Sequence, residues 1–345
     1  MKKIFILFAC ASCLQANYKT SSPVVCETIP FSAQGFIVSK PHPHTFFTVD
    51  YTYWICQPSS LRSTNLYPTQ NPDQRGIPTQ DFFPTIRANS GFKIGLGGFL
   101  TRVDWELYTE YTWFQNEHYK NKLNTQTVDP NLYGFTTIGN DFANRFNRID
   151  LVLRKNFTSG EFFLFTPFSG LLAGWDKQWW RDRKEYSWEG SYFLSDTGDN
   201  NFIEQKWWGI GPYSGLHSAL LFPIGFFCPF GQLGFYLDTG IALAYSHYQL
   251  TLNGVVFQDP SEEESRLFTD NEFAKFSLFS PMMEATIGLR WSAFYGKDKL
   301  CRFLVNIGME QQFWLDHCYF NNENFNSAAG NLLFQGLTVR GVIEY

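Results

Sequence analysis

Apolar and polar residues alternate one by one along much of this chain. Residues 47–55 place Phe, Val, Tyr, Tyr and Ile opposite Thr, Asp, Thr and Trp, and residues 283–293 place Met, Ala, Ile, Leu, Trp and Ala opposite Glu, Thr, Gly, Arg and Ser. A period of two residues predicts β-strands with two different faces. The pattern predicts ten strands, near residues 47–55, 90–98, 104–114, 142–156, 162–178, 203–221, 230–250, 273–295, 301–315 and 332–345.

The connections between these strands alternate in length. Short connections are expected near residues 99–103, 157–161, 222–229 and 296–300. Long ones are expected near residues 57–89, 115–141, 179–202, 251–272 and 316–331. This order is typical of an up-and-down barrel with tight periplasmic turns and long extracellular loops. We therefore predict an all-β fold, a transmembrane antiparallel β-barrel of about ten strands, within a range of about 8–12.

Composition supports a barrel over a helical membrane protein. Aromatic residues make up 19% of the 345 residues and charged residues 17%, below the usual level of about 25%. Mean hydropathy is −0.22, and beyond the N-terminus we find no long uninterrupted apolar run that would predict a membrane helix. The net charge of −5 gives no indication of nucleic-acid binding.

The N-terminus has the features of an export signal. Lys2 and Lys3 precede a short apolar run, and Ala16 ends a plausible cleavage site. Lipidation at Cys10 is the less favoured alternative, because Phe8 fits a lipoprotein signal poorly. We expect a signal peptide at 1–16, a periplasmic lead-in at 17–45 and a barrel at 46–345. The expected location is the bacterial outer membrane.

A closed barrel pairs every backbone polar group, as hydrocarbon requires, with the lipid covering its apolar outer face. The polar face of each strand then points into the lumen. The charged residues expected to face the lumen are Asp50, Lys93, Asp104, Glu106, Glu110, Arg148, Asp150, Arg154, Asp238, Glu284, Arg290, Glu310 and Arg340.

The last strand ends on an aromatic residue. Tyr345, Ile343 and Val339 share one face of this strand. A final amphipathic strand that stops at an aromatic residue resembles the recognition signal of barrels assembled in the outer membrane. We therefore expect the barrel assembly machinery as a partner.

Five cysteines remain after cleavage, and an odd number in an exported protein indicates a free thiol or an intermolecular disulfide. These are Cys26, Cys56, Cys228, Cys301 and Cys318. No metal site or cofactor is expected, because His42 and His44 lack further ligands nearby in the sequence.

Three segments carry a resemblance to a known family. Residues 207–216, WWGIGPYSGL, resemble the Gly-Pro-x-x-Gly-Leu strand of the Legionella major outer-membrane pore-forming family. The hairpin formed by 91–97 and 105–113 and the pair 281–284 and 288–291 are similar to the same family. The resemblance implies a pore-forming barrel. Related proteins in chlamydia-like bacteria occur in disulfide-crosslinked envelopes, which the five mature cysteines would fit.

The sequence leaves two functions open. The first is a porin-like pore that passes small hydrophilic solutes through a narrow, charged lumen. The small residues Gly91, Gly95 and Gly97, with Gly234, Gly240, Ala242 and Ala244, would widen it. The alternative is a non-transporting surface or envelope protein, an adhesin or a structural barrel crosslinked by disulfides to envelope proteins or to its own copies.

An enzyme is not expected. His118, His247 and His317 lie at loop bases beside Glu117 and Asp316. Neighbouring residues on a strand point to opposite faces, so these acids and histidines do not form acid–base pairs. We interpret the histidines as solvated polar residues.

Overall fold

A computed structural model of the chain describes residues 45–59, 87–100, 105–129, 132–159, 162–190, 193–222, 231–257, 268–295, 301–319 and 330–345. Nearly all of these residues are in strands. The strands are β1 Thr45–Pro58, β2 Asn89–Leu100, β3 Trp105–Asp129, β4 Leu132–Arg154, β5 Phe157–Ser159, β6 Phe163–Gly190, β7 Phe193–Leu221, β8 Gln232–Phe257, β9 Phe268–Tyr295, β10 Cys301–Cys318 and β11 Gly330–Glu344. No helix in these ranges is long and apolar enough to cross a membrane.

The strands form one closed antiparallel β-barrel. Apart from β4 and β5, each strand pairs with the next along the chain, and β1 pairs with β11 from Phe46↔Glu344 to Pro58↔Leu332. The short β5 follows β4 after two residues, and both pair with β6. They share one position, so the barrel has ten strands. Where all ten positions are present the ring leaves no open sheet edge, which satisfies the backbone without help from solvent. Beyond the ring, the extensions of β3 and β9 each pair on one side only.

Alternation sorts the side chains between the lumen and the outer surface. On β1, Phe47, Val49 and Tyr51 are 43–49% exposed, whereas Thr48 and Asp50 between them are at most 4% exposed. The other strands repeat this arrangement and present a broad apolar outer surface. Soluble proteins rarely expose continuous apolar areas above a few hundred Å². The outer face therefore suits contact with lipid, and the polar residues are inside.

All ten predicted strands are present, but several are longer than expected. The stretches 115–141 and 179–202, expected as long loops, continue β3, β4, β6 and β7 as paired strands, and only residues 130–131 and 191–192 separate them. Their Asn, Thr and charged residues indicated loops. A hairpin satisfies its own backbone in water as well as in lipid, so polar composition does not end it.

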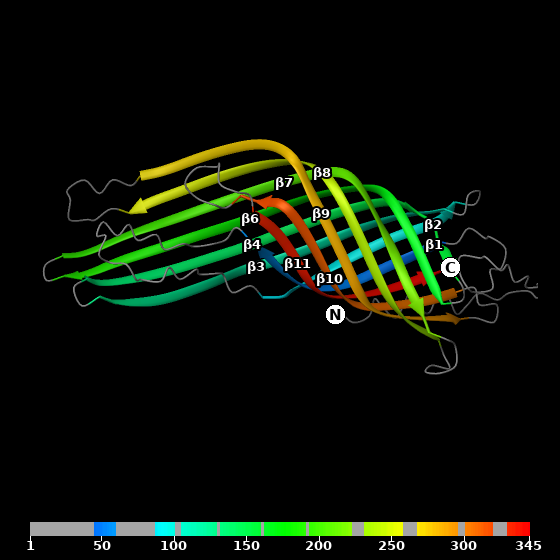
Figure 1. The fold of residues 1–345 in the computed structure, drawn as a ribbon. Helices are drawn as coiled ribbons and strands as arrows, with labels where there is room; N and C mark the ends of the chain where they lie inside the picture. The colour runs from blue at the N-terminus through cyan, green and yellow to red at the C-terminus, as the bar shows by residue number, and fades with distance from the viewer. Residues whose placement is uncertain are drawn as a thin grey trace, which may run out of the picture.

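The strand extensions make the barrel uneven. The six adjacent strands β3, β4, β6, β7, β8 and β9 project beyond the other four at one end, and the C-terminus lies at the opposite end (Figure 1). We call these the extended end and the terminal end. The predicted signal peptide and all of the lead-in except Thr45 lie outside the described residues, as does most of the connection at 57–89.

Candidate functional site: the filled lumen

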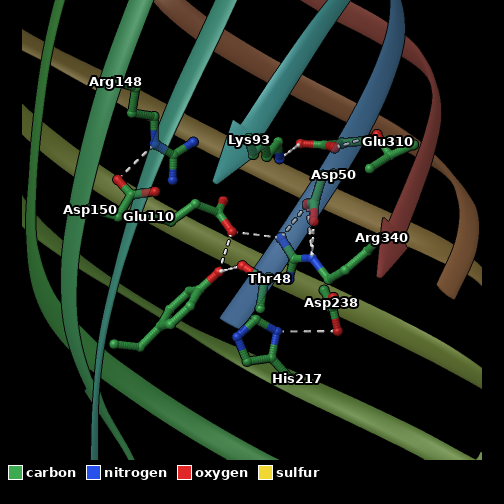
Figure 2. Close-up of polar contacts among 12 residues, drawn as sticks. Thr48, Asp50, Lys93, Glu110, Arg148, Asp150, His217, Asp238, Glu310 and Arg340 are labelled. Carbon is green, nitrogen blue, oxygen red and sulfur yellow. Dashed lines mark hydrogen bonds and ion pairs between the residues drawn. The ribbon is translucent and has the colours of Figure 1, made fainter. Parts of the chain in front are cut away.

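A layer of charged side chains crosses the middle of the lumen. We call it the charged layer, and it consists of Asp50, Lys93, Glu110, Arg148, Asp150, Glu284, Glu310 and Arg340. These residues come from β1, β2, β3, β4, β9, β10 and β11, so they converge from most of the wall. Figure 2 shows several of them pointing toward one another inside the barrel.

Three of the ion pairs in the charged layer join strands that are not neighbours, and two of them come from Lys93 and Arg148. Lys93 Nζ lies 2.7 Å from Glu310 Oε1, and Arg148 Nη1 lies 2.6 Å from Glu284 Oε2. Arg148 Nε also donates to Asp150 Oδ1 at 2.8 Å. Because β2 and β4 are not adjacent to β9 and β10, these bonds connect opposite parts of the wall across the lumen.

Arg340 on β11 forms the third pair group. Its guanidinium binds Asp50 at 2.7 Å and Glu110 at 2.8 Å. Tyr108 donates to the same Glu110 carboxylate and is 2.9 Å from Thr48 Oγ1 (Figure 2). Each charged group therefore has an opposite charge or a hydrogen bond, the condition for tolerating charges away from bulk water.

The glycines predicted to widen a pore make room for side chains instead. A Cβ at Gly91 would lie 2.7 Å from Thr52 Oγ1, and one at Gly240 would lie 2.8 Å from the Tyr213 ring. The expectation of an open wall is therefore wrong at these two positions. The space that the glycines leave is occupied by neighbouring inward side chains.

A layer of rings fills the lumen between the charged layer and the extended end. We call it the aromatic layer, and it consists of Trp54, Phe114, Phe146, Trp207, Tyr248, Trp314, His317 and Phe334. A continuous chain of ring contacts, with centroids 4.7–5.8 Å apart, runs through Trp54, Phe334, Phe146, Trp314, Trp207, His317 and Tyr248. Each of these rings is at most 2% exposed. These buried rings fill the part of the lumen in which they lie.

His317 contradicts its interpretation as a solvated residue. It is fully buried, and its Nε2 lies 2.9 Å from Asp176 Oδ2 on β6. Tyr248 Oη lies 3.3 Å from its Nδ1. The register of β10 against β11 shifts between Trp314 and Cys318, and Asp316 has a φ of 50°. This irregularity breaks the alternation and turns His317 into the lumen.

The other two histidines differ from His317. His247 Nδ1 lies 3.0 Å from Ser277 Oγ, a pair in an exposed environment. The side chain of His118 lies outside the described residues. No local pattern signals the His317–Asp176 pair, because Asp176 is 141 residues away and an irregularity within the strand aims His317 inward.

A cavity of about 120 Å³ lies in the lumen at the terminal end. Four arginines line it, Arg154, Arg290, Arg302 and Arg340. The acidic residues around it already have partners: Glu106 binds Arg154, Glu344 binds Arg302 at 3.2 Å and Asp238 binds His217 at 3.2 Å. We call this space the mouth cavity.

The structure places twelve of the thirteen predicted lumen residues on the inner face, in the charged layer or around the mouth cavity. The thirteenth, Asp104, lies outside the described residues. Several inward polar residues were not singled out from the sequence, although alternation places them on the same faces. They are Thr48, Asp176, Gln178, Gln205, Tyr213 and Thr338.

Cys56, Cys301 and Cys318 form no disulfide within the described residues. Cys56 and Cys318 are buried inside the barrel, where Asn144 and Gln178 contact their sulfur atoms. Burial in the lumen separates both from the surface of another chain. Cys26 and Cys228 lie outside the described residues, so a disulfide that involves them stays a prediction.

The predicted assembly signal lies in β11 and just after it. Ile343 pairs with Phe47 and Val339 with Tyr51 on β1, so both stand at the seam that closes the barrel. Tyr345 follows the strand and is 59% exposed. Recognition of this segment by the assembly machinery stays a prediction.

Comparison with solved structures finds membrane barrels of low sequence identity. The outer-membrane protease OmpT from Escherichia coli is 10% identical with a TM-score of 0.38, covering 93% of this chain and 99% of its own. The toluene transporter TodX from Pseudomonas putida is 8% identical with a TM-score of 0.23, covering 88% and 89%. No curated protein matches the chain in sequence.

The family comparison covers most of the chain. Residues 57–343 match the family described as Legionella pneumophila major outer membrane protein precursor. The match includes eight of the ten strand positions in full, the end of β1 and all of β11 except its last residue. With its closed barrel and apolar outer face, this chain belongs to the Legionella major outer membrane protein family and is an outer-membrane protein.

Proposed function

We propose that the protein is a closed surface barrel, a non-transporting outer-membrane protein whose lumen is filled in its resting state. The aromatic layer carries this proposal, because its ring contacts run across the barrel interior with almost no exposure. Barrels of about eight strands have interiors that side chains just fill, whereas water-filled channels occur at about sixteen strands and above. Ten strands lie near the filled limit.

The two layers obstruct a solute in different ways. Ion pairs of the charged layer would have to separate, and the rings of the aromatic layer would have to leave the lumen. Moving Trp54, Trp314 and Trp207 together is far more disruptive than exchanging ion-pair partners for water, because buried aromatic side chains each contribute several kcal/mol. On this proposal the extended strands form a projecting surface at the extended end of the barrel.

Planar-bilayer recordings on the refolded mature protein test this proposal. We expect no stable conductance steps from the native protein. The variant Trp54→Ala/Trp314→Ala supplies the control, because opening the aromatic layer should produce measurable steps and show that the barrels insert. Heat-modifiable migration on gels confirms that each variant is folded. Stable steps from the native protein at low voltage would overturn the proposal.

Thiol labelling gives a second measurement. Cys56 and Cys318 lie beside the aromatic layer and are fully buried. Maleimide should modify them much more slowly in the folded barrel than in urea, with Cys301, which is only partly buried, as the internal comparison. Rapid labelling of Cys56 or Cys318 in the folded protein would show that water reaches this layer.

A porin-like pathway is the second candidate, and the mouth cavity favours it. Arg340 lines the mouth cavity and also belongs to the charged layer. A polar route would therefore enter the lumen from the terminal end. Solutes would then pass only after the aromatic layer moves. Native conductance with ion selectivity that Arg340→Gln alters would support this candidate.

A further inference from the structure

We propose that the mouth cavity is a binding site for a small oxyanion such as a phosphate or a carboxylate, with Arg290 as its principal ligand. This inference does not depend on whether the lumen conducts. The site lies at the terminal end of the barrel, and the charged layer separates it from the aromatic layer.

The charge around the cavity is not balanced at Arg290. The lining acids Glu106, Asp238 and Glu344 are each bound by another residue. Within the described ranges, Arg290 forms no ion pair, and its buried Nε has no hydrogen-bond partner. Arg290 is partly buried, and a guanidinium partly removed from water without a partner is unfavourable, so a bound anion would supply the missing partner.

The neighbours of Arg290 add to the positive potential. In the strand register, Asn306 on β10 lies between Arg290 on β9 and Arg340 on β11. Arg302 and Arg154 are close enough to repel Arg290, whereas Glu344 and Asp238 attract it. Arg302 and Arg154 are held by their own carboxylates, so their positions are fixed before any ligand binds.

The shape and chemistry of the cavity suit an oxyanion. A guanidinium presents parallel N–H donors that match the oxygens of phosphate or carboxylate. A volume of about 120 Å³ exceeds the roughly 30 Å³ that one water molecule takes in the liquid. The Asn306 side chain also lines the cavity and offers a further polar contact.

Calorimetric titration of inorganic phosphate into the mature protein, refolded in dodecyl maltoside micelles, tests the proposal. We expect saturable binding with one site per barrel. Arg290→Gln should weaken it by about tenfold or more, because a charged hydrogen bond contributes at least that much. Arg290→Lys keeps the positive charge but loses the parallel donors, so it should retain only part of the affinity. The matched control Arg181→Gln alters an exposed arginine on β6, toward the extended end, and should change nothing.

Thermal unfolding provides a readout that does not rely on calorimetry. Phosphate should raise the unfolding midpoint of the native barrel but not that of Arg290→Gln, because a ligand stabilises only the state that binds it. The Arg290→Gln barrel should fold, since the substitution removes an unpaired charge. Absence of phosphate binding in the native protein, or equal binding in Arg290→Gln, would overturn the proposal.

A second arm of the titration distinguishes a soluble anion from a lipid headgroup. Short-chain phosphatidylglycerol mixed into the micelles presents the same phosphate chemistry on a lipid. If phosphatidylglycerol competes with inorganic phosphate at the Arg290-dependent site, the site accepts a headgroup. If only inorganic phosphate binds, the ligand is a soluble oxyanion. Either result supports the site.

Discussion

The charged layer and the aromatic layer lie in the same lumen, yet different forces hold them. In the charged layer, Lys93–Glu310 and Arg148–Glu284 depend on opposite charges brought across the barrel. In the aromatic layer, Trp54, Trp207 and Trp314 depend on close packing with little polar contact. The first layer is therefore sensitive to charge balance and the second to volume.

The two layers meet at Lys93, Trp54, Thr338 and Glu310, which we call the contact zone. Lys93 Nζ lies 5.1 Å from the ring of Trp54, and Trp54 Nε1 donates to Thr338 Oγ1 at 3.2 Å. Thr338 in turn donates to Glu310. Substitutions that disturb one layer and spare the other are therefore best chosen away from these residues.

The largest effect is expected from Arg148→Met. Removing this guanidinium leaves Asp150 and Glu284 as buried carboxylates without their main partner. We expect the free energy of unfolding to fall by about 5 kcal/mol, measured by urea unfolding of the refolded barrel. Arg148→Met/Asp150→Asn/Glu284→Gln should recover most of the loss. A loss below about 1 kcal/mol in the single variant would show that water already screens this layer.

Trp314→Ala tests the aromatic layer in the same assay. The side chain is fully buried between Phe146 and Trp207. Removing it should cost about 3–4 kcal/mol through lost packing and the cavity left behind. Trp314→Phe keeps most of the ring volume and should cost clearly less. Equal losses of unfolding free energy in Trp314→Ala and Trp314→Phe would contradict the view that side-chain volume stabilises this layer.

Lys93→Met probes charge balance at the contact zone between the layers. The substitution keeps the volume and leaves Glu310 unpaired, with an expected cost of about 3 kcal/mol. Adding Glu310→Gln removes the unpaired charge and keeps an acceptor for Thr338 and Gln312. The double variant should therefore be more stable than the single one. If the stability losses of Lys93→Met and Glu310→Gln measured singly simply add in the double variant, the ion pair is not the reason for the effect.

His317→Phe should have the smallest effect of the four. The ring volume is kept, but Asp176 loses its contact with His317 in a buried site and keeps the hydrogen bond from Gln178. We expect a loss of about 1–3 kcal/mol. Ser277→Ala, which removes the exposed partner of His247, is the matched control and should change stability by less than about 0.5 kcal/mol. A neutral His317→Phe would show that water satisfies Asp176.

The charged residues illustrate what alternation alone can predict. Asp50, Lys93 and Glu110 fall on the polar face of their strands, so a period of two assigns them to the lumen without any tertiary information. Alternation does not predict which residues form ion pairs, because Lys93 and its partner Glu310 are 217 residues apart. The strand stagger and tilt bring them level with each other, and no local pattern encodes that offset.

The sequence by itself determined the approximate positions of the ten strands, their two faces and the closed antiparallel order, because the side-chain period is a local property and an apolar outer face in lipid requires a sheet without edges. Only the tertiary structure decided the lengths of β3, β4, β6 and β7, the inward turn of His317 and the filling of the lumen. These depend on which side chains meet across the barrel. The volume left at its centre is set by the whole ring, not by any one strand.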